Sequence, residues 1–450
     1  MTEAPWVTWL GDDFTGSAAV MEVLEFAGLP AVLFTGIPSP GLAARFADCR
    51  GVGIATTARS HDPAWMAQSL PAPLRWLDGL KAPILHYKIC STFDSSALSG
   101  SIGAAIEIGL RIRPARAVPL LTAAPQMRRY QAFGHLFAGT LDGVFRLDRH
   151  PVMSRHPVTP MAESDLLRHL AAQTGLRSAL IDLEGLADPQ AVETALASGA
   201  RILSLDSMGP VSETAAGRLI WENRAALGFV AGSQGVEYAL VRHWQASGAI
   251  PRVRAPEALP PADRIVAVSG SVSPITARQL GWAGRNGFAL LPFDARAVTG
   301  GDADRTAEET RLTQAAIAAA QAGQSPLVHS ASGEGPQVDA FRDALSRSGM
   351  DPAAANRRIG ESLGRILDAT LRATGIRRAV ISGGDTSGHG MRQLGLSALV
   401  ARAPTIPGAA LCQAFGDGPH DGLEIALKGG QMGSEDYFGW IRAGGGDRRE

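Results

Sequence analysis

The sequence predicts a protein of two α/β domains, each built on a mostly parallel sheet. Three observations lead to this prediction. Short apolar runs alternate with segments of helical periodicity, a pattern typical of parallel sheets whose two faces are covered by helices. A stretch rich in proline, alanine and charge, at 246–262, interrupts this alternation. The chain of 450 residues is also longer than one domain usually is.

The first part of the chain supplies a series of candidate strands, each a short apolar run. They lie at 5–10, 31–35, 51–56, 84–89, 117–122, 178–183, 202–206 and 227–231. Candidate helices fill several of the intervals, at 16–28, 61–80, 101–112, 162–174, 188–198 and 211–226. We therefore expect a first domain over residues 1–245.

The alternation restarts after the linker at 246–262. Candidate strands lie at 265–268, 288–292, 325–329, 379–381 and 423–427, and candidate helices lie at 304–322, 336–347, 353–374 and 389–402. These elements predict a second domain over 263–440. The remaining residues, 441–450, end in a polar, glycine-rich stretch that we expect to be frayed.

Composition excludes several classes of protein. Lys plus Arg number 42 against 43 for Asp plus Glu, so the net charge of −1 predicts neither a nucleic-acid partner nor an anionic membrane surface. The three cysteines argue for a reducing compartment and against a disulfide scaffold. The N-terminus lacks the pattern of a signal peptide, and no apolar run is long enough to span a membrane. A cytoplasmic protein is therefore expected.

Glycine and serine follow the strands of the second domain. The loops begin at Ser269, at Ser330, at Ser382 and at Lys428, directly after the strands at 265–268, 325–329, 379–381 and 423–427. Ligands of parallel sheets bind beyond the carboxyl ends of the strands. Glycine lets backbone N–H groups approach an anion, and a following helix N-terminus adds partial positive charge. One such loop alone is equally consistent with a tight turn, but four of them predict a nucleotide phosphate site.

The candidate phosphate ligands come from three of these loops. Neither a P-loop nor a dinucleotide-binding fingerprint is present. Lys88 or Lys428, together with Mg²⁺, could supply the positive charge that a P-loop lysine provides elsewhere. The predicted nucleotide-binding residues are Ser269, Ser271, Ser273, Gly383, Gly384, Asp385, Thr386, Gly429 and Gly430.

Charged residues and hydroxyls follow the strands of the first domain instead. Asp12 and Asp13 come after strand 5–10, and Arg59 comes after strand 51–56. Strand 84–89 carries Lys88 and leads into a hydroxyl-rich segment that contains Ser91 and Thr92. Such groups suit a small polyhydroxylated carboxylic acid, because Arg binds a carboxylate bidentately and Asp accepts hydroxyl protons. A helix cap at Asp13 and surface ion pairs at Arg59 and Lys88 are the alternative interpretation.

Together the two halves predict phosphoryl transfer in the cleft between the domains. The first domain would bind a small acid and the second ATP, and positioning and charge neutralisation would provide most of the catalysis. Two other classes stay open. One is a lyase in which Lys88 forms a Schiff base or Asp12 and Asp13 hold a metal. The other is a non-catalytic sensor of a nucleotide or sugar.

Several motifs resemble the four-carbon acid sugar kinase family. They are GDDFTG, YKICST, RHPVTPM, AGSQGVE, SGSVS, SGGDTSG with a following LG, and ALKGGQMGSEDYFG, and they occur in the family's order over nearly the whole chain. The resemblance implies ATP-dependent phosphorylation of acid sugars such as threonate, erythronate or 3-oxo-tetronate. It also implies an N-terminal substrate domain and a C-terminal nucleotide domain.

The resemblance carries roles onto particular residues. It implies ATP contacts at Ser271, at 383–386 and near Gly430, and substrate contacts at Asp12, Asp13, Arg59 and Lys88. One of the two aspartates would accept the proton of the substrate hydroxyl, and Asp385 is an alternative ligand for Mg²⁺. No metal ligand set is identified. The expected partners are the acid sugar and ATP; a homodimer is considered, and the sequence leaves the oligomeric state open.

The chain departs from the family at one segment. Many members carry KKxDSTLRG where this sequence reads Lys88-Ile89-Cys90-Ser91-Thr92-Phe93-Asp94-Ser95. An aspartate is replaced by Cys90, and an arginine is lost near Asp94. This variant is similar to the branch associated with branched or oxidised acid sugars, such as 3-oxo-isoapionate, which we take as the leading specific substrate. Lys88 beside Cys90 could also lower the pKa of the thiol, although no Cys–His arrangement points to a nucleophile.

Overall fold

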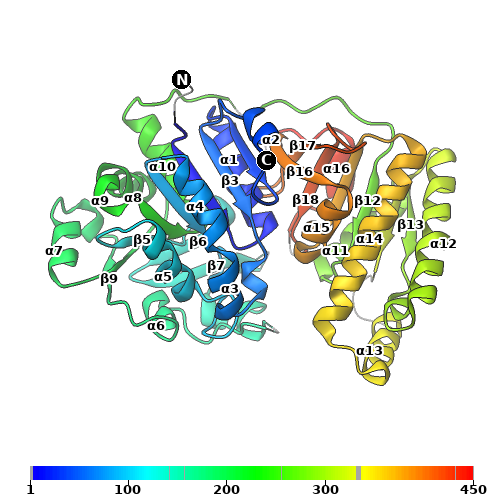
Figure 1. Cartoon of the computed structure of the whole chain (residues 1–450), viewed down its shortest axis with the longest axis horizontal. Coiled ribbons are helices and arrows are strands. Elements are labelled where there is room, and N and C mark those ends of the chain that lie inside the picture. The colour runs from blue at the N-terminus through cyan, green and yellow to red at the C-terminus, as the bar shows by residue number, and fades with distance from the viewer. Residues whose placement is uncertain are drawn as a thin grey trace. The chain divides into compact units, whose positions relative to one another are not determined.

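The computed structural model describes residues 4–448, except 141, 157, 255, 331–335 and 431. Within helices, the side chains of 336–338, 353 and 385 are also left out. The chain forms two compact units, residues 1–254 and residues 255–450, which are described here one at a time. In Figure 1 the first unit runs from blue to green and the second from green to red. Both are α/β units with mostly parallel sheets, so the predicted fold class is confirmed.

The sheet of the first unit is parallel throughout, in the order β2-β3-β1-β4-β11-β5-β10-β9. Burial of its central strands on both faces explains why they appear as continuous apolar runs. The strands are β1 (Val7–Gly11), β2 (Ala31–Phe34), β3 (Gly51–Ala55), β4 (Ile84–Lys88), β5 (Val118–Leu121), β9 (Ser178–Ile181), β10 (Ile202–Leu205) and β11 (Phe229–Gly232).

Helices accompany this sheet along the chain (Figure 1). They are α1 (Phe14–Phe26), α2 (Pro40–Ala44), α3 (Pro63–Ser69), α4 (Pro71–Gly79), α5 (Ile102–Ile112), α6 (Leu166–Ala171), α7 (Ala191–Ala197), α8 (Pro210–Glu222), α9 (Arg224–Leu227) and α10 (Gly235–Ala246). The helix predicted over 61–80 is divided in two, since a new helix begins at Pro71, a residue favoured at the first helical position. Helix α10 was missed.

A small antiparallel sheet after β5 was also missed by the sequence analysis. It consists of β6 (Arg129–Ala132), β7 (His135–Thr140) and β8 (Gly143–Arg146). These strands are short and mostly half-buried, so they lack the apolar runs that identify the central strands.

The sheet of the second unit has the order β13-β14-β12-β15-β18-β17-β16. Pairing is parallel as far as β18 and antiparallel for β17 and β16. The strands are β12 (Val266–Ser269), β13 (Phe288–Pro292), β14 (Ser325–His329), β15 (Arg378–Ser382), β16 (Leu396–Ala403), β17 (Leu411–Gly416) and β18 (Glu424–Lys428). The helices are α11 (Pro274–Arg285), α12 (Asp302–Gln321), α13 (Pro336–Ser348), α14 (Pro352–Thr374), α15 (Gly384–Gln393) and α16 (Tyr437–Arg442).

Two predictions for the second unit were wrong. The helix predicted over 389–402 ends at Gln393, and Gly395 with φ +64° leads into strand β16. Only glycine adopts that backbone conformation without strain, so the helix stops there. The tail is not frayed as far as Gly446, whose N–H donates to Pro404 O (2.8 Å) and whose carbonyl accepts from Trp440 Nε1 (3.2 Å).

Helices α8 and α10 pack closely at Gly217, where an added Cβ would collide with the carbonyl group of Ala239. We expect Gly217→Ala to lower stability by about 1–3 kcal/mol, because neither backbone can move aside without disturbing the packing. Thermal unfolding measures the change. The matched control is Gly281→Ala in α11, whose Cβ would meet, among the described residues, only Arg285 Nη1 at 3.7 Å. This control should gain stability from helix propensity, by up to about 1 kcal/mol. Equal melting temperatures for the two variants would contradict the close approach.

Candidate active site

Strands β3, β1 and β4 are neighbours in the first unit and end at the same edge of the sheet. Asp12 and Asp13 follow β1, Arg59 lies in the turn after β3, and Lys88 is the last residue of β4. The backbone ties these loops together, since Asp12 N donates to Lys88 O (3.0 Å) and Arg59 N donates to Asp12 O (3.0 Å). Parallel pairing therefore brings together four charged residues that are far apart in the sequence.

The four side chains form a cluster of ion pairs. Arg59 Nη2 lies 2.6 Å from Asp13 Oδ1 and 3.3 Å from Asp12 Oδ1. Lys88 Nζ lies 3.2 Å from Asp13 Oδ1 and 3.7 Å from Asp12 Oδ1. The side chains of Lys88 and Asp12 are only 2% and 6% exposed, so each charge needs its partner.

The two carboxylates differ in what their oxygens do. Both oxygens of Asp12 are engaged, because Oδ1 contacts the cations while Oδ2 accepts from Arg59 Nε (3.4 Å) and from Cys90 N (3.3 Å). Asp13 Oδ1 accepts from Gly16 N (3.0 Å), which makes Asp13 the N-cap of α1. Asp13 Oδ2 has no partner among the described residues, and the side chain is 21% exposed. One carboxylate oxygen of the cluster is thus available to a ligand.

Electrostatics separates the two aspartates further. Burial raises the pKa of Asp12, and the nearby Arg59 and Lys88 only partly offset that effect. Burial acts in the same direction on Asp13, but Arg59 and Lys88 outweigh it and hold the pKa of Asp13 well below its ordinary value. The two carboxylates therefore hold their protons with different strength, as in many acid–base pairs.

Glycines at both ends of the GDDFTG segment fit this packing. A Cβ at Gly16 would collide with Lys88 Nζ, and a Cβ at Gly11 would collide with Ser17 Oγ. A bulkier residue at Gly16 would therefore push the ammonium group away from Asp13.

The segment after Lys88 forms a second polar group around Asp94. Thr92 Oγ1 donates to Asp94 Oδ1 (3.0 Å), and Cys90 Sγ donates to Asp94 Oδ2 (3.4 Å). Burial and Asp94 raise the pKa of the Cys90 thiol, so the lowering by Lys88 that the sequence allowed does not prevail. Ser91, the other hydroxyl predicted here, makes no side-chain hydrogen bond among the described residues. Asp94 itself was not predicted as a site residue.

In the second unit, β14, β12, β15 and β18 are neighbours, and the glycine and serine loops follow their carboxyl ends. Backbone bonds join the loops, because Gly270 N donates to Ser382 O (2.9 Å) and Gly383 N donates to Lys428 O (2.8 Å). The part of the predicted loop at 331–335 lies outside the described residues, as do Gln431 and the side chain of Asp385.

Most of the predicted phosphate ligands lie close together in this group of loops. Thr276 Oγ1 donates to Ser271 Oγ (3.0 Å), and Ser273 Oγ donates to Gly430 O. Added Cβ atoms at Gly270 and Gly430 would collide with Thr386 Oγ1 and Ser271 Oγ, so the loops approach as closely as glycine allows. Ser273 is also the N-cap of α11.

Two features of these loops call for a ligand. The hydroxyls of Ser269 and Ser382, paired residues at the ends of β12 and β15, are buried without a hydrogen-bond partner. Lys428 is fully buried, and its Nζ donates only to Gly429 O (2.9 Å), without an ion pair among the described residues. Burial lowers the pKa of Lys428 to about 8. A buried cation without a counter-ion and unused hydroxyls at helix-leading loops are what a phosphate group would complete.

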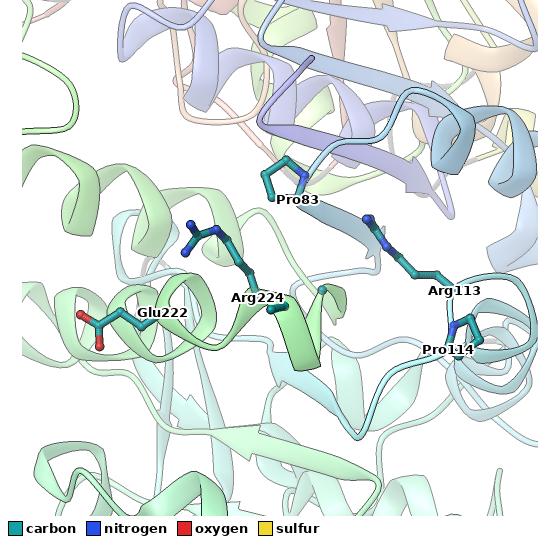
Figure 2. Close-up of a pocket in the computed structure, with 7 residues that line it drawn as sticks. Pro83, Arg113, Pro114, Glu222 and Arg224 are labelled. Atoms are coloured by element: carbon teal, nitrogen blue, oxygen red, sulfur yellow. The ribbon is translucent and has the colours of Figure 1, made fainter. Parts of the chain in front are cut away.

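A cavity of about 500 Å³ lies elsewhere on the first unit (Figure 2). It is bordered by Pro83 and Gly228, which precede β4 and β11, so it lies at the amino ends of those strands. Its arginines are already engaged, Arg113 with Asp78 (3.4 Å) and Arg224 over the ring of Trp221 (4.3 Å). Ligands of parallel sheets bind at the other edge, so this cavity is not the candidate site.

Comparison with known proteins supports a division of roles between the units. A family model described as a sugar-binding N-terminal domain matches residues 7–240, and one described as a nucleotide-binding C-terminal domain matches residues 266–438. No helix of the described residues is long and apolar enough to cross a membrane.

Relatives match over nearly the full length. A 3-oxo-isoapionate kinase from Paraburkholderia graminis is 45% identical over 97% of this chain and 94% of its own. A 3-oxo-tetronate kinase from Burkholderia multivorans is 30% identical over 96% of both chains. A solved structure from Salmonella typhimurium LT2 is 26% identical with a TM-score of 0.75, covering 97% of this chain and 98% of the other. The resemblance inferred from the motifs is thus confirmed, and the chain belongs to the acid sugar kinase family whose members join a sugar-binding N-terminal domain to a nucleotide-binding C-terminal domain.

Proposed function

We propose that this protein transfers the terminal phosphate of ATP to a hydroxyl group of a small acid sugar, with 3-oxo-isoapionate as the leading substrate. The observation that carries the proposal is the free Oδ2 of Asp13 in a cluster whose other charged groups are paired. The relative that shares 45% identity, a 3-oxo-isoapionate kinase, supports the choice of substrate.

In this proposal Asp13 orients the substrate hydroxyl and accepts its proton. Its lowered pKa makes it a weak base, but phosphoryl transfer needs positioning more than strong deprotonation of the nucleophile. Arg59 and Lys88 fix Oδ1, and Asp12 in turn holds both cations. Ser91 and Thr92 are the remaining predicted contacts to the sugar.

The nucleotide phosphates would bind at the loops of the second unit. Backbone N–H groups of 384–386 and the hydroxyls of Ser269 and Ser271 would donate hydrogen bonds, and Lys428 would supply positive charge. The N–H of Gly383 and the hydroxyl of Ser273 already donate to Lys428 O and Gly430 O, so these two residues would shape the loops. Gly429 and Gly430 would let the backbone approach. The sugar hydroxyl and the terminal phosphate must meet for transfer, so both units take part in one reaction.

Mg²⁺ is expected to accompany ATP, and the residues of the second unit fit it. Mg²⁺ prefers oxygen ligands and is commonly bound through substrate phosphates with few protein groups. The unpartnered oxygens of Ser269 and Ser382 are of this kind. The described residues contain no group of three or more His, Cys, Asp or Glu that could hold a metal. When bound, Mg²⁺ would neutralise phosphate charge.

The other classes are less well supported. A Schiff base requires a neutral amine, whereas Lys88 forms ion pairs with both aspartates. A sensor would not need a carboxylate oxygen free beside the sugar. We place the reaction in the cytoplasm, where ATP is available and the three free cysteines would remain reduced.

An assay of ADP release with a panel of C4 and branched C5 acid sugars tests the proposed function. With Mg²⁺ present, at least one acid sugar should stimulate ADP formation by the wild-type enzyme. Asp13→Asn should lower kcat by about 10²–10⁴-fold, because the amide cannot accept the proton, while Asn still caps α1.

The control for this variant is Asp62→Asn. Asp62 caps α3 by accepting from Trp65 N (2.8 Å), as Asp13 caps α1, but it is not part of the ion-pair cluster. Asp62→Asn should leave kcat unchanged. If no acid sugar stimulates ADP release by the wild type, the kinase proposal is wrong. If acid sugars do stimulate it and Asp13→Asn retains full activity, the role proposed for Asp13 is wrong.

Gly384 tests the phosphate loop of the second unit. A Cβ there would meet no atom of the described residues within 4 Å, so Gly384→Val should fold normally and project into the space of the ligand. We expect ATP to bind at least about tenfold more weakly, a loss of roughly 1.4 kcal/mol. Gly301→Val, at a second helix start with open space, is the control and should bind ATP as the wild type does. Unchanged affinity in Gly384→Val would remove this loop from the site.

The lowered pKa of Lys428 leads us to expect that ATP binding depends on pH. Because burial lowers its pKa to about 8, the free enzyme loses this positive charge as the pH rises through that value. ATP keeps its charge there, since phosphate ionises near pH 6. Calorimetric titrations between about pH 7 and pH 9 should show affinity falling with pH. Lys428→Met should bind ATP more weakly with a flat profile. A flat profile in the wild type would argue against a phosphate contact by Lys428.

A further inference from the structure

An acid sugar has a carboxylate as well as hydroxyl groups. The ion-pair cluster at Asp12 and Asp13 is poorly suited to binding that carboxylate. Arg59 and Lys88 are already neutralised by the two aspartates at distances of 2.6 to 3.7 Å. A substrate carboxylate placed there would compete with Asp13 for the same cations. The carboxylate therefore requires a cation elsewhere on the same edge of the sheet.

Arg129 lies on that edge. It begins β6, and its backbone forms a bridge with Ala124, since Ala124 N donates to Arg129 O (3.0 Å) and Arg129 N donates to Ala124 O (3.2 Å). Ala124 follows the carboxyl end of β5, and β11 alone separates β5 from β4, which carries Lys88. Two strand spacings amount to roughly 10 Å. Arg129 and Arg59 thus flank the loop after β4 from opposite sides.

The guanidinium group of Arg129 is held in place at one nitrogen and free at another. Nη1 donates to Met127 O (3.0 Å), Arg128 O (3.3 Å) and Gly139 O (3.3 Å). Nε is buried without a partner, and Nη2 has none among the described residues. No carboxylate of the described residues forms an ion pair with it. The carbonyls orient the group without neutralising its charge.

The residues known to share a face of the small sheet with Arg129 are not anionic. Arg129, Ala138 and Phe145 are directly opposite one another across β6, β7 and β8, so their side chains share one face of the small sheet. The His150 ring packs against Phe145 on that face at 6.2 Å. His150 Nδ1 accepts from Val152 N and Met153 N, which assigns the proton to Nε2 and leaves a neutral donor.

Asp94, a carboxylate that acts electrostatically on Arg129, is engaged in other hydrogen bonds. Its two oxygens accept from Thr92 and Cys90. Burial lowers the pKa of Arg129, and Cys90 and Asp94 act in the opposite direction, so this polar group and the guanidinium lie within electrostatic range of each other.

We propose that Arg129 binds the carboxylate of the acid sugar and thereby selects acids over neutral sugars. The inference rests on the proposed kinase function and adds the carboxylate contact to it. The hydroxyl end of the substrate would reach Asp13 while its acid end reaches Arg129, across the segment Cys90–Asp94 that differs from the family pattern.

A comparison of two substrates across two enzymes tests this contact. The substrates are the acid sugar that releases ADP most rapidly and the same sugar with its carboxylate converted to a primary amide. The wild type should prefer the acid by about 10- to 100-fold in kcat/KM, as expected for a charge-assisted hydrogen bond. Arg129→Gln should lose that preference, mainly through a higher KM for the acid, with the KM for ATP unchanged. Arg129→Lys should restore part of it.

The control is Arg128→Gln, the adjacent arginine, which donates to Thr140 O and should retain the wild-type preference. If Arg129→Gln slows the acid and the amide equally, the residue is structural and the proposal is overturned. An unchanged KM for the acid in that variant overturns it as well. Failure of the kinase function would appear differently, as a wild-type enzyme that releases no ADP with any acid sugar.

Discussion

The ion pairs between Asp12, Asp13, Arg59 and Lys88 are the constraint on which the first unit depends. Two carboxylates and two cations come from three strand ends and are largely withdrawn from water, so removal of any one leaves an uncompensated buried charge. Glycine occupies the positions where the backbone comes closest to neighbouring side chains, at Gly11 and Gly16. Helix α1, which Asp13 caps, and the turn that carries Arg59 are both fixed by hydrogen bonds to the same cluster.

The loops at the strand ends of the second unit contain fewer charged groups than the cluster of the first unit. Its loops present hydroxyls, backbone N–H groups and one buried ammonium group, and they leave several of these without a protein partner. Buried polar groups are normally satisfied, so the unpaired hydroxyls of Ser269 and Ser382 at neighbouring strand ends support the proposed phosphate site. The cluster of Asp12, Asp13, Arg59 and Lys88 thus neutralises its own charges, whereas the loops of the second unit keep Lys428 without a counter-ion among the described residues.

The sequence predicted the parts of this structure that repeat a simple physical rule. Central parallel strands are apolar throughout, so the bounds of β1, β3, β4 and β12 were predicted to within a residue or two. The polar residues directly after these strands could then be proposed as site residues. The small sheet that carries Arg129 was missed because its strands are half-buried and short. Strand β16 was predicted as part of a helix because the spacing of its apolar residues fits a helix as well as a strand. The positive φ of Gly395, which ends the helix before β16, is not evident from that spacing. The free oxygen of Asp13 and the lack of a described counter-ion at Lys428 depend on contacts between distant segments, which no local pattern encodes.

In the proposed mechanism, in which Asp13 accepts the proton of the substrate hydroxyl, its two oxygens share one delocalised charge, and this charge changes during the reaction. A proton accepted at Oδ2 removes most of the negative charge that Oδ1 presents to Arg59, Lys88 and Gly16 N. The attraction that assembled the site is therefore weakest at the moment the phosphorylated sugar has formed. Release of the product and return of the proton to water would restore this attraction, so under the proposed role of Asp13 the ion pairs would weaken and strengthen again once in every turnover.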